Sequence, residues 1–211
     1  MWLSAGCSRR RRGVERKRAE PVAVSRALLR ALVLPLATQG FAMAAAAPAG
    51  AQTFLTQEEA LALVFPPPAT IERRTAYLDD GQIAAANRLA GEAEVESGII
   101  TYYEGRTEDG PVGYAYFDAH RVRTLDEVLM VVVSPDGSVS RIEVLQFLEP
   151  RDYLPPERWL DLFTGRRLDD RLATKADIVN LTGATLTSGA VTRAVRRVLA
   201  LHETIHRGAV P

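Results

Sequence analysis

The sequence of 211 residues predicts an α+β fold in which helices flank an antiparallel sheet within a single domain. Three observations support this class. Segments rich in Val, Ile, Tyr and Phe follow one another between residues 99 and 147. A Pro-Asp-Gly turn joins two of them directly, as expected for an antiparallel hairpin. Helical patterns come before and after this run of strands.

The expected strands are defined by their β-branched and aromatic content, and they cover residues 70–78, 99–103, 112–118, 127–134 and 138–147. Between the last two, Pro135 presets one backbone dihedral and Gly137 accepts a positive one, which predicts a tight turn. Residues 177–181 are expected to be a brief strand or an extended approach to the last helix. These strands account for most of the predicted sheet.

Four helices are expected. Thr56 and Glu59 resemble a capping box that opens a short helix to about Val64. Residues 82–90 follow Asp80-Gly81, and a short helix after Pro155-Pro156 carries Trp159 and Phe163 and stops at Gly165. The last helix is expected over residues 189–206, with Gly208 as its cap and an apolar stripe from Val191 to Ile205. Its arginines 193, 196 and 197 are expected on a solvated face.

The first 51 residues have the three zones of a secretory signal peptide. Nine Lys and Arg stand against two acidic residues, an apolar run of 17 residues extends from Ala31 to Ala47, and Ala49-Gly50-Ala51 offers a cleavage site. The second interpretation is an uncleaved membrane anchor, although Pro35 and Gly40 weaken it as a span. We therefore expect an exported, periplasmic protein with a signal peptide or anchor at 1–51, an extension at 52–97 and the main domain at 98–206.

Residues 52–211 carry 17 basic and 24 acidic side chains, a net charge of −7. An acidic domain without a basic stripe argues against nucleic-acid binding. Cys7, the only cysteine, falls within the leader, so the mature protein has no thiolate for a metal or haem attachment. With three scattered histidines, no metal site is expected, and any redox chemistry must come from an organic cofactor.

One segment, residues 182–188, reads Thr-Gly-Ala-Thr-Leu-Thr-Ser and precedes the last helix. Free N–H groups and the positive end of a helix dipole suit a phosphate. Gly183 permits unusual dihedrals, and Ala184 leaves space beside the Thr185 hydroxyl. A Thr-rich turn before a helix is often only a cap, and Thr187 or Ser188 could serve in that way.

The segment resembles the flavinylation motif of the covalent FMN-binding domain family, which includes the flavin-bearing subunits of sodium-pumping NADH:quinone reductase and Rnf complexes. The resemblance covers most of residues 98–203. It implies the fold of that domain and an FMN cofactor held by a phosphoester bond to Thr185. Residues Thr182, Gly183, Ala184, Leu186, Thr187 and Ser188 would complete the cofactor site.

Glu149 would join that site, because it stands where family members carry a Glu-Thr-Pro loop beside the flavin. Val179 departs from the family pattern, which often has an acidic residue there, and Asp177 is the nearest substitute. Tyr102, Tyr103, Tyr114, Tyr116 and Phe117 are candidates to stack on the isoalloxazine, although core packing is the more common role. His120, near a strand end, could tune the flavin or titrate, but loop histidines are usually solvated.

The resemblance also implies partners: an FAD-dependent, Mg²⁺-requiring flavin transferase for maturation, and a membrane redox partner such as a haem-bearing transmembrane reductase. The first hypothesis is therefore an exported electron carrier within a membrane-associated complex rather than a stand-alone enzyme. The second is a sensory or assembly module that binds FMN non-covalently. A hydrolase with Thr185 or Ser188 as nucleophile is a third, but no histidine is placed as its base.

Overall fold

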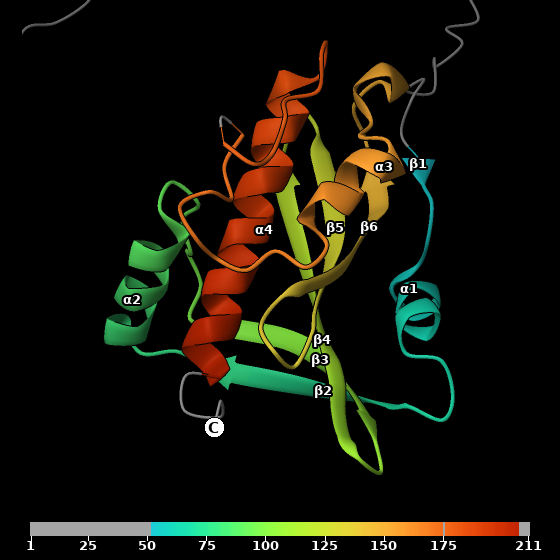
Figure 1. Cartoon of the computed structure of the whole chain (residues 1–211), viewed down its shortest axis with the longest axis vertical. Coiled ribbons are helices and arrows are strands. Elements are labelled where there is room, and N and C mark those ends of the chain that lie inside the picture. Colours follow the sequence, from blue (N-terminus) through green and yellow to red (C-terminus); the bar gives the residue numbers. More distant parts are fainter. Residues whose placement is uncertain (1–51, 175, 207–211) are drawn as a thin grey trace, which may run out of the picture. The chain divides into compact units, whose positions relative to one another are not determined.

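The computed structural model describes residues 52–174 and 176–206, and their centre is one antiparallel sheet (Figure 1). The strand order is β1-β6-β5-β4-β3-β2, so consecutive strands from β2 to β6 form a meander, which β1 extends beside β6. The strands are β1 (Gln52–Thr53), β2 (Thr70–Tyr77), β3 (Ile99–Thr107), β4 (Gly110–Arg121), β5 (Asp126–Val133) and β6 (Val139–Phe147). The predicted α+β class is confirmed.

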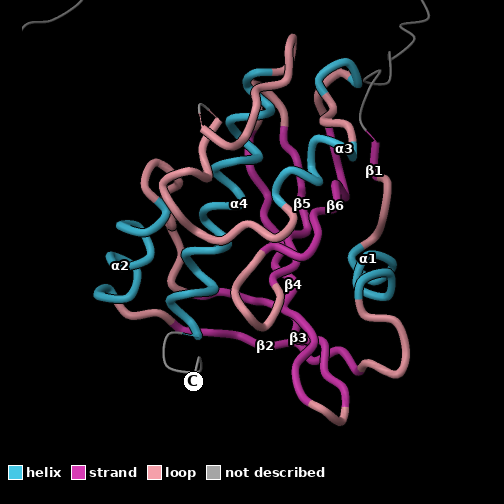
Figure 2. Tube along the Cα trace, viewed as in Figure 1, coloured by secondary structure: helices cyan, strands magenta, loops and turns pink. Residues whose placement is uncertain are grey.

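Helices lie on both faces of this sheet (Figure 2). The long last helix, α4 (Thr185–His206), packs against β4 and β5, and α2 (Asp80–Ala90) packs beside it. The short helix α1 (Gln57–Val64) covers the opposite face. β5 is therefore buried on both sides: Leu129 and Val131 contact the α4 side, and Met130 contacts the α1 side. This double burial explains why β5 is apolar almost throughout.

Local capping sets where the first two helices begin. The Thr56 hydroxyl accepts from the Glu59 N–H at 3.2 Å, and the Glu59 carboxylate accepts from the Thr56 N–H at 2.8 Å, so the expected capping box is present. Asp79 and Gln82 repeat this arrangement before α2. Because Asp79 is the cap, α2 begins at Asp80, two residues earlier than expected.

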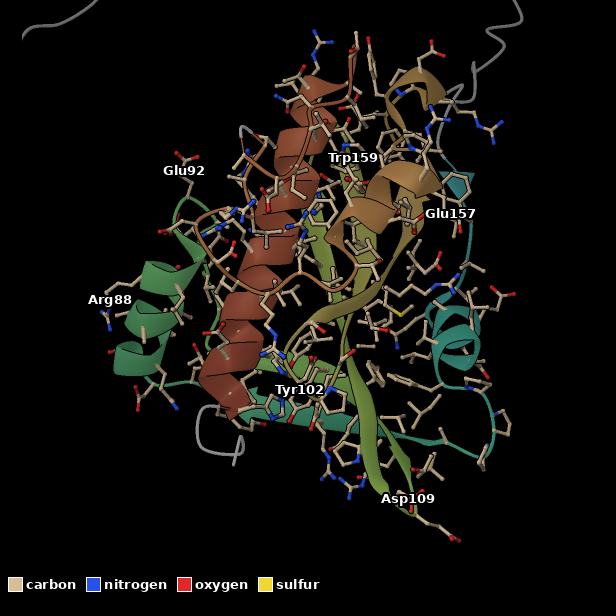
Figure 3. All side chains as sticks on the ribbon, viewed as in Figure 1. Arg88, Glu92, Tyr102, Asp109, Glu157 and Trp159 are labelled. Atoms are coloured by element: carbon tan, nitrogen blue, oxygen red, sulfur yellow. The ribbon has the colours of Figure 1, made fainter. Side chains whose placement is uncertain are left out.

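Short helices connect β6 to α4: η1 (Arg151–Tyr153), α3 (Glu157–Leu160) and η2 (Asp161–Phe163). Trp159 (labelled in Figure 3) and Phe163 are both buried in the main core, with their ring centroids 5.3 Å apart. Gly165 follows with a φ of +77°, which ends the helical stretch. The expected short helix after Pro156 is thus confirmed.

The strands lie where they were predicted, and β3 and β4 are longer than the predicted ranges 99–103 and 112–118. The turn after β5 has Gly137 at φ +85°, and its N–H donates to the Ser134 carbonyl at 2.9 Å. Residues 177–181 contain no strand: 177 and 178 lie in a turn and a bend, and residues 179–181 have no regular structure. The last helix begins at Thr185 rather than Gly189, because its first intrahelical bond runs from Ser188 N–H to the Ala184 carbonyl at 3.0 Å.

Three side chains expected in solvent are instead engaged in tertiary contacts. Arg196 donates to backbone carbonyls of the segments around residues 89–90 and 169–172. Arg197 forms two hydrogen bonds with Asp118, at 2.7 and 2.8 Å. His120 lies between two carboxylates inside the fold. Of the arginines expected on a solvated face, Arg193 is the exposed one.

The predicted leader at 1–51 and the predicted cap Gly208 lie outside the described residues. Among the helices that are described, none is long and apolar enough to cross a membrane.

Candidate functional site

The motif at residues 182–188 forms a tight turn followed by the first turn of α4. The Ala184 N–H donates to the Leu181 carbonyl at 3.0 Å, and Gly183 has a φ of +86°. Only glycine adopts this conformation readily, so the turn depends on Gly183. Thr185, Leu186 and Thr187 then occupy the first three helical positions.

Those three positions leave backbone donors free. Within the described part of the chain, no group accepts a hydrogen bond from the N–H groups of Thr185, Leu186 or Thr187. The first N–H groups of any helix lack intrahelical partners, and the helix dipole places positive charge there. The start of α4 therefore offers several donors to an anion.

Thr187 and Ser188 do not cap α4, because both lie within it. The Ser188 hydroxyl is fully buried; it accepts from the Leu181 N–H at 2.9 Å and donates to the Ala184 carbonyl at 3.1 Å. Ser188 thus holds the turn from within the helix, and the residue at the cap position is Ala184. The Thr185 side chain is exposed and keeps its hydroxyl accessible.

A pocket of about 250 Å³ opens beside the start of α4. Residues 183–187 of the motif line one side, and Val122, Arg123, Glu149 and Tyr153 line the other. Six of the eight predicted site residues therefore meet here. Thr182 and Ser188 do not line the pocket; Thr182 is exposed in the turn, and Ser188 has the structural role described above.

Glu149 lines the pocket, but one of its carboxylate oxygens accepts hydrogen bonds from the loop between β4 and β5. Oε1 accepts from the Thr124 N–H at 2.6 Å and from the Leu125 N–H at 2.8 Å. These hydrogen bonds, first that of Thr124, lower the pKa of Glu149. Glu149 is thus ionised at neutral pH, and it fixes the loop that carries Arg123 into the pocket.

Arg123 is the pocket residue that sequence reasoning missed. It is exposed and supplies a cation close to the free N–H groups of α4. Val122 and Tyr153 were missed as well. They contribute an apolar and an aromatic side chain to the lining of the pocket. The sequence holds one weak signal for Arg123, since it lies in a short connection between two strands. Nothing local, however, indicates that this connection reaches residues 183–187.

Trp159 holds the segment that leads into the motif, at Val179. Its indole N–H donates to the Val179 carbonyl at 2.6 Å, while the Val179 side chain is exposed. Asp177 is engaged elsewhere: its carboxylate pairs with Arg171 at 2.8 Å and also with Arg166. These two guanidinium groups, first that of Arg171, lower its pKa. Asp177 is not among the residues that line the pocket.

The aromatic candidates lie away from this pocket. Tyr102, Tyr114 and Tyr116 pack against His202 and His206 at the far end of α4 (Tyr102 is labelled in Figure 3). Twenty-one residues of helix at 1.5 Å each separate Thr185 from His206, about 30 Å. Tyr103 and Phe117 face α1. Stacking of these rings on a flavin at Thr185 is therefore excluded, and their role is core packing.

Residues 202–206 read His-Glu-Thr-Ile-His, the spacing found on zinc-binding helices. Here the His202 Nδ1 atom and the Tyr116 hydroxyl are hydrogen-bonded at 3.0 Å, inside the core. Burial lowers the pKa of His202 to about 4. The described residues contain no group of three His, Cys, Asp or Glu side chains able to hold a metal ion. This pattern therefore forms part of the aromatic core.

Comparison with known proteins identifies the segment that carries the site. Residues 126–200, from β5 to most of α4, match the model of a family described as FMN-binding domain. The match places this segment in an FMN-binding domain family, as the resemblance drawn from residues 182–188 implied. No curated protein and no solved structure matches the chain significantly.

The residues around the pocket fit FMN. A phosphate would find the free N–H groups of α4 and the Arg123 guanidinium, both of which favour an anion. Val122, Leu186 and Tyr153 provide surfaces suited to an apolar ring. No histidine among the described residues lines the pocket, so no imidazole base is placed for hydrolysis. The family match supports flavin binding by this segment, and the pocket beside Thr185 is the candidate site for it.

Proposed function

We propose that the protein carries FMN covalently, through a phosphoester bond to the Thr185 hydroxyl. The observation that supports this most strongly is the position of Thr185. It is exposed at the first residue of α4, inside a pocket that also contains free N–H groups and the Arg123 cation. A threonine in this position is accessible to another enzyme, and the surroundings stabilise the negative charge that a phosphodiester retains.

No histidine among the described residues lines the pocket, and the Glu149 carboxylate is already bound to the backbone of Thr124 and Leu125, so we infer that attachment needs a separate catalyst. The proposed catalyst is a Mg²⁺-dependent flavin transferase that uses FAD. Its reaction breaks the pyrophosphate bond of FAD, forms a bond from the FMN phosphorus to the Thr185 oxygen, and releases AMP and the hydroxyl proton. The exposed turn at Thr182 and Gly183 gives such an enzyme access to the acceptor.

Electron transfer is the proposed role of the loaded protein. Flavin exchanges one or two electrons, while the protein supplies position and electrostatics. The proposed setting is extracytoplasmic, because of the leader pattern at residues 1–51. There the protein would pass electrons between a membrane redox partner, such as a haem-bearing transmembrane reductase, and a second acceptor. On this proposal it is a carrier or a complex subunit rather than a stand-alone enzyme.

The test is mass spectrometry of the denatured chain after co-expression with a flavin transferase. The wild type is expected to gain the mass of one FMN residue, and Thr185→Ala is expected to lose that gain completely. Thr182→Ala is the matched control, since Thr182 belongs to the same turn but lies outside the pocket, and it should remain modified. An unmodified wild type beside a modified known substrate of the same transferase would overturn the covalent proposal.

One observation favours a second candidate, a module that binds FMN non-covalently. Family members often carry an acidic residue at the position of Val179, and here the neighbouring Asp177 is occupied by Arg166 and Arg171. Recognition by the transferase would then be weak. Acid denaturation separates the two cases, because covalent flavin stays with the chain and non-covalent flavin is released.

A further inference from the structure

Four ionisable side chains form a continuous hydrogen-bonded chain between the sheet and α4. The Arg197 guanidinium makes its two hydrogen bonds to Asp118, and Asp118 Oδ1 lies 2.9 Å from His120 Nδ1. His120 Nε2 lies 3.1 Å from Glu127 Oε2. The exposed fractions of the four side chains, from Arg197 to Glu127, are 21%, 9%, 10% and 0%. The chain thus leads from a partly exposed group to a fully buried one.

Glu127, at the inner end, is the least satisfied member. Its Oε1 atom is buried and has no hydrogen-bond partner among the described residues. An unpaired carboxylate oxygen in the interior destabilises the ionised form, because the lost hydration is not replaced. Burial accordingly raises the pKa of Glu127, although the hydrogen bond from His120 opposes this. A proton added to Glu127 would relieve this cost.

The inner end is close along the chain to the pocket beside Thr185. His120 and Glu127 face each other in register on β4 and β5, at the base of the connection that contains Val122 and Arg123. One residue separates His120 from the pocket wall at Val122, and Thr124 and Leu125 of the same connection are held by Glu149. A change of charge on a flavin held in that pocket would act on this nearby pair through space.

The outer end meets solvent. A cavity of about 460 Å³ is lined by Asp118, His120 and Arg197, so water reaches the middle of the chain. The other charged side chains around this cavity are Glu94, Glu96 and Arg121. His120 is suited to pass protons along this route. Although burial alone would lower its pKa, hydrogen bonds to Asp118 and Glu127 raise it to about 8.

We propose that Glu127 takes up a proton from solvent, through His120, when the bound flavin is reduced. The inference rests on the proposed function at the neighbouring pocket. An external two-electron donor, dithionite in the experiment, is oxidised and its electrons enter the isoalloxazine. The flavin nitrogens take up their own protons, and Glu127 binds one more, which bulk water supplies along the cavity and His120. This extra proton partly compensates the charge added to the flavin.

The direct test is a reduced-minus-oxidised infrared difference spectrum of the flavin-loaded protein. Protonation of Glu127 is expected to produce the carbonyl stretch of a carboxylic acid on reduction, shifted in heavy water and by ¹³C-labelled glutamate. Glu127→Gln should lack this band, and Glu108→Gln, an exposed residue in the β3–β4 turn, should keep it. Absence of the band in the wild type overturns the proposal, even if Glu127→Gln fails to fold.

Potentiometry gives a second readout. One extra proton changes the reduction equilibrium constant tenfold per pH unit, about 30 mV for a two-electron couple. In the wild type and in Glu108→Gln, the slope of the reduction potential against pH is expected to include this additional term at neutral pH. Glu127→Gln is expected to lose it. Equal slopes in all three proteins contradict the proposal. If mass spectrometry shows Thr185 unmodified, the measurement is made with added FMN, so failure of covalent attachment is distinguished from failure of proton uptake.

The flavin-free protein gives a check that needs no cofactor. The pKa of the His120 imidazole, followed by NMR, is expected at about 8 and should fall in Glu127→Gln, because one of its two hydrogen-bonded carboxylates is lost. It should not move in Glu108→Gln. An unchanged pKa in Glu127→Gln would show that the two groups are not coupled, and the route through His120 would be rejected.

Discussion

Thr185 has its position because of the two residues before it. Gly183 turns the chain with a positive φ, and buried Ala184 supplies the carbonyl that starts α4. The hydroxyl of Thr185 consequently projects from the first helical residue, where backbone donors are free. A residue with a Cβ at position 183 would disfavour this conformation, because left-handed dihedrals are unfavourable for L-residues.

Gly183→Ala tests this dependence, with Gly137→Ala as its matched control. Both glycines have nearly equal positive φ values, and an added Cβ meets nothing within 4 Å at either site. Each variant is expected to lose about 1 kcal/mol in urea unfolding, from backbone strain alone. Gly183→Ala alone should also reduce FMN attachment, measured by mass. Equal losses of attachment in both variants would mean that global stability, rather than the local turn, controls loading.

At the scale of elements, the site depends on three connections that approach one helix end. The β4–β5 connection is tied by Glu149, the approach to the motif is tied by Trp159, and Ser188 ties the turn to α4. Each tie is a side chain bonded to backbone, so it fixes the course of a loop without regular structure. The pocket is therefore lined by residues of the connections and by the first turn of α4.

Trp159→Phe removes one of these ties while retaining an aromatic ring in the core. The lost hydrogen bond to the Val179 carbonyl is expected to cost about 1 kcal/mol in urea unfolding. FMN attachment, followed as a time course, should become slower because residues 179–182 are less constrained. Phe163→Leu is the control: it disturbs the same core but makes no bond to Val179. If Phe163→Leu slows attachment as much, core packing rather than the Trp159 hydrogen bond orders the motif.

At the scale of the whole described region, α4 connects two chemically different ends. Its start lines the pocket beside Thr185, and its last turns contribute His202 and His206 to the tyrosine cluster about 30 Å away. The helix crosses the sheet between these ends through an apolar stripe that includes Val191, Val195 and Leu199. Changes at the histidine end of α4 are therefore expected to alter stability without altering the pocket beside Thr185.

Tyr116→Phe tests this separation. The substitution leaves buried His202 without the hydroxyl 3.0 Å from its Nδ1 atom, which should cost about 1–2 kcal/mol in urea unfolding. FMN attachment to Thr185 should match the wild type at a temperature where both proteins are folded. A large loss of attachment under those conditions would show that the two ends of α4 are coupled.

Local sequence patterns determined the fold class, the hairpin at Pro135 and Gly137 and the capping box at Thr56, and they pointed to residues 182–188 as the candidate site. These features depend on neighbouring residues, so a single chain displays them directly. The start of α4 was misjudged by four residues, because Thr185, Leu186 and Thr187 read as a polar turn. Only the hydrogen bond from Ser188 to Ala184 shows that the helix already includes them.

Only the tertiary structure decided which distant groups join the motif. Arg123 is 62 positions from Thr185, and its loop is held by Glu149 from another segment. Likewise, His120 and Glu127 face each other only because β4 and β5 pair in that register, and Asp118 meets Arg197 only because α4 packs on the sheet. Electrostatic partners of this kind depend on distance in space, which spacing along the chain does not encode.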